Sequence, residues 1–210
     1  MLIDCREHLN SELFIVEGKS AASAVQSVRD RQTQAVFSMQ GKIPNAAIPG
    51  SSKKLLANTK VQGLLAALDP AGIGELPLSE IRYQKLILLS DPDADGLHAR
   101  SLLITFFYTC LRTVVERGSL YIAYPPLYRI ESGALEKTYV AFTKSEYEEV
   151  LDDLRKHGDH HPAVSRFKGL GSLGQQLLHQ CCIDVQGRRI SQLGLNDCEA
   201  LLANMRRVKS

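Results

Sequence analysis

Three aspartates stand at alternate positions directly after an apolar run. Asp91, Asp93 and Asp95 follow the segment Lys85–Ser90 (KLILLS) and crowd negative charge into about 7–14 Å of extended chain, at ~3.3 Å per residue. A hard divalent cation or a basic group must neutralise this charge. A fourth acid, Glu17, ends a second apolar run (LFIV), and adjacent parallel strands deliver their carboxyl ends to one crevice. These residue types and spacings predict one Mg²⁺ site shared by the four acids.

Three other interpretations fit these acids and the adjoining residues less well. An EF-hand loop would also begin with such a triplet and place Gly96 sixth, but its twelfth position is Leu102 instead of a glutamate, and a strand precedes it instead of a helix. The GKS sequence at 18–20 resembles the end of a phosphate-binding P-loop, yet the glycine required five positions earlier is Leu13. A solvated turn is the remaining alternative, since Asp and Gly favour turns.

The acids are predicted to lie at the edge of an α/β sheet. Apolar runs predict four strands, at Glu12–Val16, Gln34–Met39, Lys85–Ser90 and Ser119–Ala123. Helices are expected between them, at Ser20–Arg31, Lys53–Leu68 and Leu97–Arg117. This alternation predicts a parallel sheet flanked by helices over residues 1–130. A small α-rich tail is expected over residues 131–210, with a turn at 131–133 and helices at Lys144–His157, Leu173–Cys182 and Asn196–Arg206.

The composition fits a globular protein without covalent cross-links. The 210 residues are 44% hydrophobic, which allows a sizeable core. Five cysteines without a C-x-x-C pair predict a reduced cytoplasmic protein with no structural zinc. A net charge of +2 neither requires nor excludes nucleic acid, although basic residues outnumber acids after His160. The apolar run Leu102–Cys110 is too short to span a bilayer, so no membrane partner is expected.

Several motifs together resemble one region of bacterial type II DNA topoisomerase B subunits, the gyrase B and topoisomerase IV B family. The segment Leu89–Ile130, which holds the acidic triplet, looks like the corresponding stretch of that family. Upstream, ELFIVEGKSA and QGKIPN resemble the family's E-L-[FY]-[IL]-V-E-G-D-S-A and K-G-K-I-L-N motifs. Downstream, RFKGLG at Arg166–Gly171 is similar to R-Y-K-G-L-G. The resemblance covers most of the chain and implies a Rossmann-like TOPRIM fold.

This resemblance implies a metal-dependent role in DNA cleavage. In that family the TOPRIM acids hold Mg²⁺ while a tyrosine on a partner A subunit cleaves double-stranded DNA. Carried onto this sequence, Glu17, Asp91 and Asp93 are expected to be the catalytic metal ligands, with Asp95 supporting the same site. Oxygen ligands at an open site suit Mg²⁺, and Mn²⁺ is expected to replace it. The implied location is the cytoplasm, in association with the nucleoid.

Four basic residues are expected to contact DNA. Lys42 and Lys168 match lysines of the family's GKILN and KGLG motifs, and each stands beside a glycine, so that backbone and ammonium can approach a phosphate. His98 matches the histidine of the family's DGSH motif, and Arg100 follows two residues later. The alternatives are solvated lysines and a purely structural hydrogen bond for His98.

Two features depart from the family pattern. Lys19 stands where the family has an acidic residue, which inverts the charge two positions from Glu17. No segment resembles the ATPase region or carries the cleavage tyrosine, so ATP is expected to act only through an absent N-terminal domain and the chain is expected to be inactive alone. The alternative function is a non-catalytic homologue that binds DNA or a topoisomerase. A TOPRIM nuclease is less favoured, because the RFKGLG motif argues against it.

Overall fold

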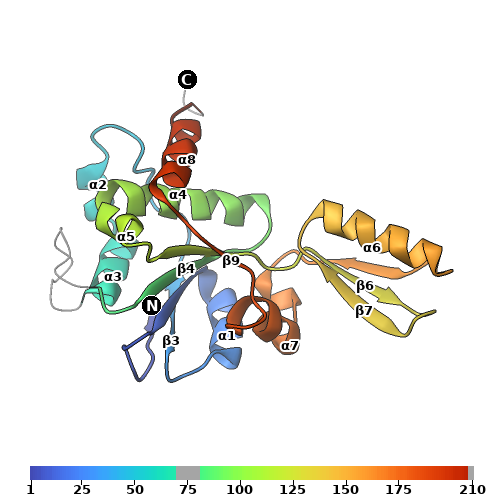
Figure 1. Cartoon of the computed structure of the whole chain (residues 1–210). Coiled ribbons are helices and arrows are strands. Elements are labelled where there is room, and N and C mark those ends of the chain that lie inside the picture. The colour runs from blue at the N-terminus through green and yellow to red at the C-terminus, as the bar shows by residue number, and fades with distance from the viewer. Residues whose placement is uncertain (70–80, 208–210) are drawn as a thin grey trace.

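The computed structural model describes residues 1–69 and 81–207. At its centre lies a six-stranded sheet with the order β1-β3-β2-β4-β5-β9 (Figure 1). Strands β3, β2, β4 and β5 are parallel, whereas β1 and β9 pair antiparallel at the two edges. The predicted strands are confirmed, and two short edge strands complete the sheet. The bounds are β1 Leu2–Ile3, β2 Glu12–Glu17, β3 Gln34–Met39, β4 Lys85–Leu89, β5 Leu120–Ala123 and β9 Ile190–Gln192.

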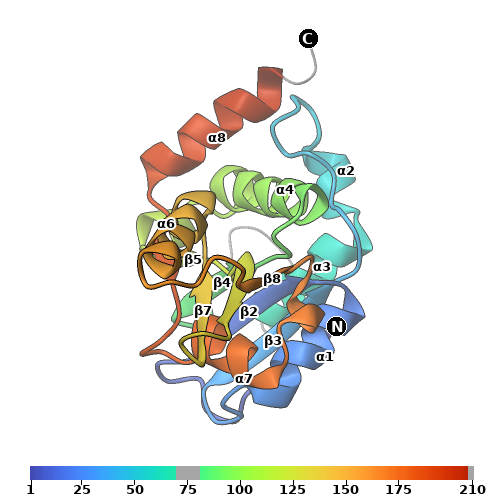
Figure 2. The same cartoon turned by 90° about the vertical axis from the view of Figure 1, so that its right-hand side faces the viewer.

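Helices cover both faces of this sheet, as the α/β prediction requires. Helices α2, α3, α4, α5 and α8 enclose one apolar core, and α1 and α7 enclose another on the opposite face (Figure 2). No helix within the described ranges is long and apolar enough to cross a membrane. The bounds are α1 Gly18–Val28, α2 Ser52–Leu56, α3 Thr59–Leu68, α4 Ala94–Cys110, α5 Arg112–Glu116, α7 Gln175–Leu178 and α8 Leu195–Arg207.

Three predicted helices are each divided in the structure. The helix predicted over 53–68 forms α2 and α3, because the side chain of Asn58 accepts hydrogen bonds from N–H groups in the first turn of α3 and caps it. Helix α4 begins three residues earlier than predicted because Asp93 caps it, and α5 starts after a break at Leu111. The helix predicted after residue 172 forms α7 and a π-helical turn, η2, at His179–Ile183.

The tail contains more strand than the sequence predicts. A second, antiparallel sheet with the order β7-β6-β8 carries α6 and projects from the main body as an arm (Figure 1). The predicted boundary at residue 130 and the start of the predicted turn both fall inside β6. Only alternate residues of β6 are well buried, so it lacks a continuous apolar run. The bounds are β6 Tyr128–Ser132, β7 Lys137–Ala141, β8 Ala163–Arg166 and α6 Lys144–Lys156.

After β8 the chain returns to the main sheet. The short helix η1 (Leu170–Ser172), α7 and η2 pack with α1, where Leu170, Leu178 and Cys182 are buried in the core beneath the sheet. Strand β9 then pairs with β5, and α8 packs on α4. Residues after 130 therefore form both the arm and the last layer of the main body.

A buried ion pair fixes this return at the amino end of β2. Arg188 donates hydrogen bonds of 2.6 and 2.5 Å to the two carboxylate oxygens of Glu12, and Gln34 donates a third at 3.0 Å. Both charged side chains are buried. Burial alone would raise the pKa of Glu12, but the adjacent guanidinium outweighs that effect and holds this pKa below its ordinary value.

Arg188→Leu is expected to lower the free energy of unfolding by about 3–5 kcal/mol, because it removes both guanidinium hydrogen bonds from the buried Glu12 and leaves it the longer ionic contact with Lys85 Nζ at 3.5 Å. Urea unfolding at neutral pH measures this loss. The double variant Glu12→Leu/Arg188→Leu should recover most of it, since both charges are gone. Because the pKa of Glu12 is depressed in the folded state, the stabilisation by the pair is present above the unfolded pKa and is lost as pH falls through the folded pKa. A difference between the wild type and Arg188→Leu that stays constant with falling pH would contradict this account.

Candidate metal centre

Glu17 and the acidic triplet lie at the carboxyl edge of the main sheet. Strands β2 and β4 are neighbours, and their register pairs Val16 with Leu89. Glu17 is the last residue of β2, and Asp91 comes two positions after β4 ends, so the two acids stand on adjacent strands spaced ~4.8 Å apart. Gly18 has a φ of 80°, a conformation that favours glycine, and it turns the chain from β2 into α1 immediately after the acid.

Electrostatic interactions link these acids to one another and to a lysine. Burial raises the pKa of Glu17, and the positive charge of Lys42 opposes this rise. The charges of Asp91, Asp95 and Asp93 raise the pKa of Glu17 further, in that order. The pKa of the half-buried Glu17 therefore depends on the charge of all three aspartates.

The loop between β4 and α4 is shaped by its own residues. Asp93 caps α4, and its carboxylate accepts a hydrogen bond of 2.7 Å from the N–H of Gly96. A Cβ atom on Gly96 would lie only 2.3 Å from the carbonyl oxygen of Asp91, so only glycine fits there. The spacing D-x-D-x-D-G thus lets the chain wrap closely around Asp91 at the start of a helix.

The RFKGLG motif of the tail packs directly against Asp91. The N–H of Leu170 donates a hydrogen bond of 2.8 Å to Asp91 Oδ1. A Cβ atom on Gly169 would meet Asp91 Oδ2 at 3.1 Å, and one on Gly171 would lie 3.6 Å from Ser20 Oγ at the start of α1. Sequence reasoning expected this motif to contact DNA, and it missed the role of the backbone in holding an acid.

Lys42 reaches the acids from the loop after β3. Its Nζ lies 2.8 Å from Asp95 Oδ1, where the hydrogen bond and the charge of the lysine lower the pKa of Asp95. The lysine side chain is the less exposed of the two, and the ion pair lies at the surface. Gly41, with a φ of 77°, makes the turn before it, and Lys60 Nζ donates a hydrogen bond of 3.2 Å to the Lys42 carbonyl oxygen.

A narrow, mostly apolar pocket lies beneath this edge, with four polar side chains in its lining. Glu17, Lys42, Ser90 and Arg100 all contribute to it. Ser90 Oγ is buried and has no hydrogen-bond partner among the described residues. The Arg100 guanidinium lies over the ring of Tyr124, 5.9 Å from its centroid, and burial lowers the pKa of this arginine.

The other basic residues near the acids are exposed. His98 lies in α4, one turn after its start, and its charge makes a small contribution to lowering the pKa of Asp95, after that of Lys42. Lys168 stands one residue before Gly169. Lys19 lies in the first turn of α1. Of these basic residues and Lys42, Lys42 is the one with an ion pair to an acid of the cluster among the described residues.

The chemistry of the donors fits a hard divalent cation. Carboxylate oxygens are the ligands that Mg²⁺ and Mn²⁺ prefer, and the buried hydroxyl of Ser90 lies nearby without a partner among the described residues. Within the described part of the chain, however, the ligand atoms of Glu17, Asp91 and Asp93 do not all lie within 4.8 Å of one another. Their like charges repel, and Asp93 is turned toward its own helix. Binding of one ion by all three requires rotation of these side chains.

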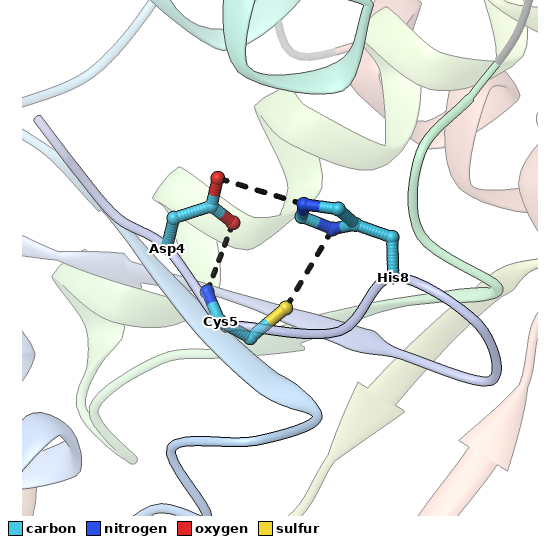
Figure 3. A group of neighbouring side chains, drawn as sticks. All are labelled: Asp4, Cys5 and His8. Carbon is cyan, nitrogen blue, oxygen red and sulfur yellow. Dashed lines mark hydrogen bonds and ion pairs between the residues drawn. The ribbon is translucent and has the colours of Figure 1, made fainter.

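A second group of ligand-type side chains lies at the opposite, amino end of the sheet. Asp4, Cys5 and His8 bring three such atoms within 4.8 Å of one another, with Cys5 Sγ 3.7 Å from His8 Nδ1 (Figure 3). Arg82 contacts both the Asp4 carboxylate and His8 Nε2, and the Tyr83 hydroxyl donates a hydrogen bond of 2.7 Å to Asp4 Oδ1. The Arg82 guanidinium already neutralises Asp4, and burial raises the pKa of the Cys5 thiol, so neither side chain is a free anionic metal ligand. We therefore interpret the group as a hydrogen-bonded network that joins the start of the chain to the residues just before β4.

Comparison with known families identifies the sheet and its acids. The family model described as the Toprim domain matches residues 12–124, from the start of β2 to just past β5. The chain belongs to the Toprim family. The matched range contains Glu17, the acidic triplet and Lys42, so the predicted fold and resemblance are confirmed.

Nearly the whole chain, arm included, is similar to B subunits of type II topoisomerases. It is 37% identical over 201 residues to the DNA gyrase B subunit of Archaeoglobus fulgidus, which covers 94% of the chain and 30% of that protein. It is 41% identical over 201 residues to the DNA topoisomerase 4 B subunit of Escherichia coli K12, and 38% identical over 203 residues to the DNA gyrase B subunit of Thermus thermophilus, each covering 93% of the chain and 31% of the relative. The chain thus spans about a third of the length of these relatives.

Gly169→Ala tests the contact between the tail motif and Asp91. The added Cβ would press on the Asp91 carboxylate, so the hydrogen bond from the Leu170 N–H should weaken and the Leu170 amide should exchange faster with solvent. The loss in unfolding free energy should be about 1 kcal/mol, the net value of one hydrogen bond. Gly133→Ala is the matched control, because a Cβ there meets nothing within 4 Å. Equal exchange of the Leu170 amide in both variants would refute the contact.

Proposed function

We propose that this chain is the Mg²⁺-binding Toprim part of a type II DNA topoisomerase. In this proposal it supports cleavage and religation of double-stranded DNA by a tyrosine on a partner A subunit, in the cytoplasm. The observation that carries the proposal is that Glu17, at the end of β2, and the three aspartates, which follow the neighbouring parallel strand β4, lie close enough for each aspartate to affect the pKa of Glu17. Similarity to gyrase and topoisomerase IV B subunits supports the reaction class.

Three of the acids are proposed to hold the cation. Glu17, Asp91 and Asp93 would be its ligands, and Asp95 would support the same site from the first turn of α4. A bound Mg²⁺ or Mn²⁺ would stabilise negative charge on the transferring phosphate and the leaving 3′-oxygen. The chain's own contribution is to hold these oxygens in place, and the hydrogen bond from Leu170 to Asp91 serves that purpose.

The surrounding basic residues are proposed to bind the DNA backbone. Lys168 and His98 are exposed beside the acids, and Arg100 and Lys42 line the pocket below them. Ammonium and guanidinium groups around a phosphate neutralise its charge and position the duplex without reading its sequence. Exposed basic groups next to carboxylate ligands could bind the phosphates of a DNA backbone that passes over the cation.

One observation favours the second candidate, a non-catalytic module that binds DNA or a topoisomerase. Lys19 is exposed two residues after Glu17, where the family motif carries an acidic residue, and it changes the charge beside the proposed cation. A lysine there strengthens attraction for a phosphate while it weakens attraction for a metal ion. The two candidates share the fold and differ in whether the bound DNA is cleaved.

Asp91→Ala and Glu17→Ala should each weaken Mn²⁺ binding by about 10-fold or more, because each removes a ligand oxygen. Isothermal titration of the full chain measures the change. Asp152→Ala is the matched control, since Asp152 is an exposed carboxylate on α6 that pairs with nearby Arg155, far along the chain from the acids. Identical titration curves for the wild type, Asp91→Ala and Asp152→Ala would exclude the assigned centre.

Cleavage should depend on a partner. The chain alone should not nick plasmid DNA with added Mg²⁺, whereas a mixture with a matching topoisomerase A subunit should cleave it. Glu17→Ala should reduce that cleavage by about 100-fold, as lost transition-state stabilisation does. Lys19→Asp should raise it if charge beside Glu17 limits the reaction. Tight binding of the A subunit without cleavage by either the wild type or Lys19→Asp would favour the binding module, and nicking by the lone chain that Asp91→Ala abolishes would favour a nuclease.

A further inference from the structure

The ammonium of Lys42 is a positive charge in direct contact with one of the four acids, Asp95. It lies 2.8 Å from Asp95 Oδ1, and its charge also opposes the rise in the pKa of Glu17 that burial and the aspartates cause. The lysine is held there by its loop, because the turn at Gly41 and the hydrogen bond from Lys60 fix its backbone. The lysine side chain is the less exposed member of this surface ion pair, at 34% against 83% for the aspartate.

We propose that Lys42 is a resident counter-ion that a bound divalent cation displaces, so that metal binding releases Lys42 to contact a DNA phosphate. The inference rests on the proposed function and adds that binding of the divalent cation and binding of the DNA are coupled through Lys42. A dication among the acids would repel an ammonium a few ångströms away while it takes over neutralisation of Asp95 and Glu17. The freed lysine then stands beside the metal with no acid to hold it, where phosphate is the available anion.

The buried hydroxyl of Ser90 supports the exchange independently. Ser90 is 7% exposed, and its Oγ lies in the lining of the pocket that Glu17 and Lys42 also line, without a hydrogen-bond partner among the described side chains and backbone groups. An ammonium that points outward to Asp95 leaves this hydroxyl unpaired. A Mg²⁺ ion usually keeps several of its waters, and one of them would give Ser90 the missing partner. This hydroxyl, next to Asp91 in the chain, is thus a polar group that a water of the bound cation would satisfy.

The first test measures cation affinity. Lys42→Met should bind Mn²⁺ roughly 3- to 10-fold more tightly than the wild type, because a competing positive charge is removed. Titration calorimetry on the full chain gives the affinity, and Lys42→Ala repeats the test with a second side chain. The matched control is Lys144→Met, which breaks a comparable exposed pair with Glu148 in α6 and should leave the affinity unchanged.

The second test measures affinity for a labelled DNA duplex with and without Mg²⁺. Lys42→Met should bind DNA as tightly as the wild type in EDTA and several-fold more weakly in Mg²⁺, because the lysine is free only when the cation is bound. Lys168→Met gives the contrast: Lys168 is exposed and no ion pair holds it among the described residues, so its loss should weaken binding under both conditions.

The outcomes separate this inference from the proposed function. Unchanged or weaker Mn²⁺ binding by Lys42→Met, with binding still lost in Asp91→Ala, would overturn the displacement and leave the metal centre intact. A Mn²⁺ affinity that is the same in Asp91→Ala and in the wild type would overturn both the displacement of Lys42 and the proposed metal centre. An effect of Lys42→Met on DNA affinity that is the same in EDTA and Mg²⁺ would overturn the release step.

Discussion

The crowding of like charge at the carboxyl edge of β2 and β4 is the constraint on which the surrounding structure depends. Two carboxylates 4 Å apart repel by about 1 kcal/mol in water and by more where burial lowers the dielectric constant. The fold answers this repulsion with three different partners. An ammonium reaches Asp95, a backbone N–H reaches Asp91, and the first turn of α4 takes the carboxylate of Asp93 as its cap. Glu17 has no such direct partner among the described residues. The charge of Lys42 only partly offsets burial and the nearby aspartates, so the pKa of Glu17 stays raised.

The last third of the chain is tied to both ends of the central strands. At the amino end of β2, Arg188 neutralises Glu12 in a buried pair, and at the carboxyl edge Leu170 donates to Asp91. These contacts show that residues beyond the Toprim match pack against Glu12 and against Asp91 of the acidic cluster. An isolated fragment that ended after β5 would lose the guanidinium that pairs with Glu12 and the N–H group that donates to Asp91. The Toprim sheet and the returning tail are therefore expected to fold as one unit.

Continuous apolar runs made the main sheet predictable from the sequence. Strands β2 and β4 are continuous buried runs. An acid ends β2 and another follows β4 by two residues, as expected of parallel strands that meet at one edge of a sheet. The arm was not predicted, because β6 alternates between buried and exposed residues and β8 is exposed throughout, which leaves no apolar run. Among site residues, the four acids and Lys42 follow from spacing and motif. The roles of Leu170 and Ser90 could not be predicted in this way. Leu170 binds Asp91 through its backbone N–H, which any residue except proline has, and Ser90 is notable only because its hydroxyl has no partner among the described groups.

The short path between the arm and Asp91 has a mechanical consequence. Strand β8 ends at Arg166, and the residue that holds Asp91 is Leu170, so only three residues lie between a strand of the arm and the hydrogen bond to the acid. Three residues span at most about 11 Å when fully extended, and Phe167 within them is anchored by a hydrogen bond from its N–H to the Leu127 carbonyl oxygen. The connection between the arm and the acid is therefore short. A partner that tilts the arm relative to the main sheet would move the backbone that donates to Asp91.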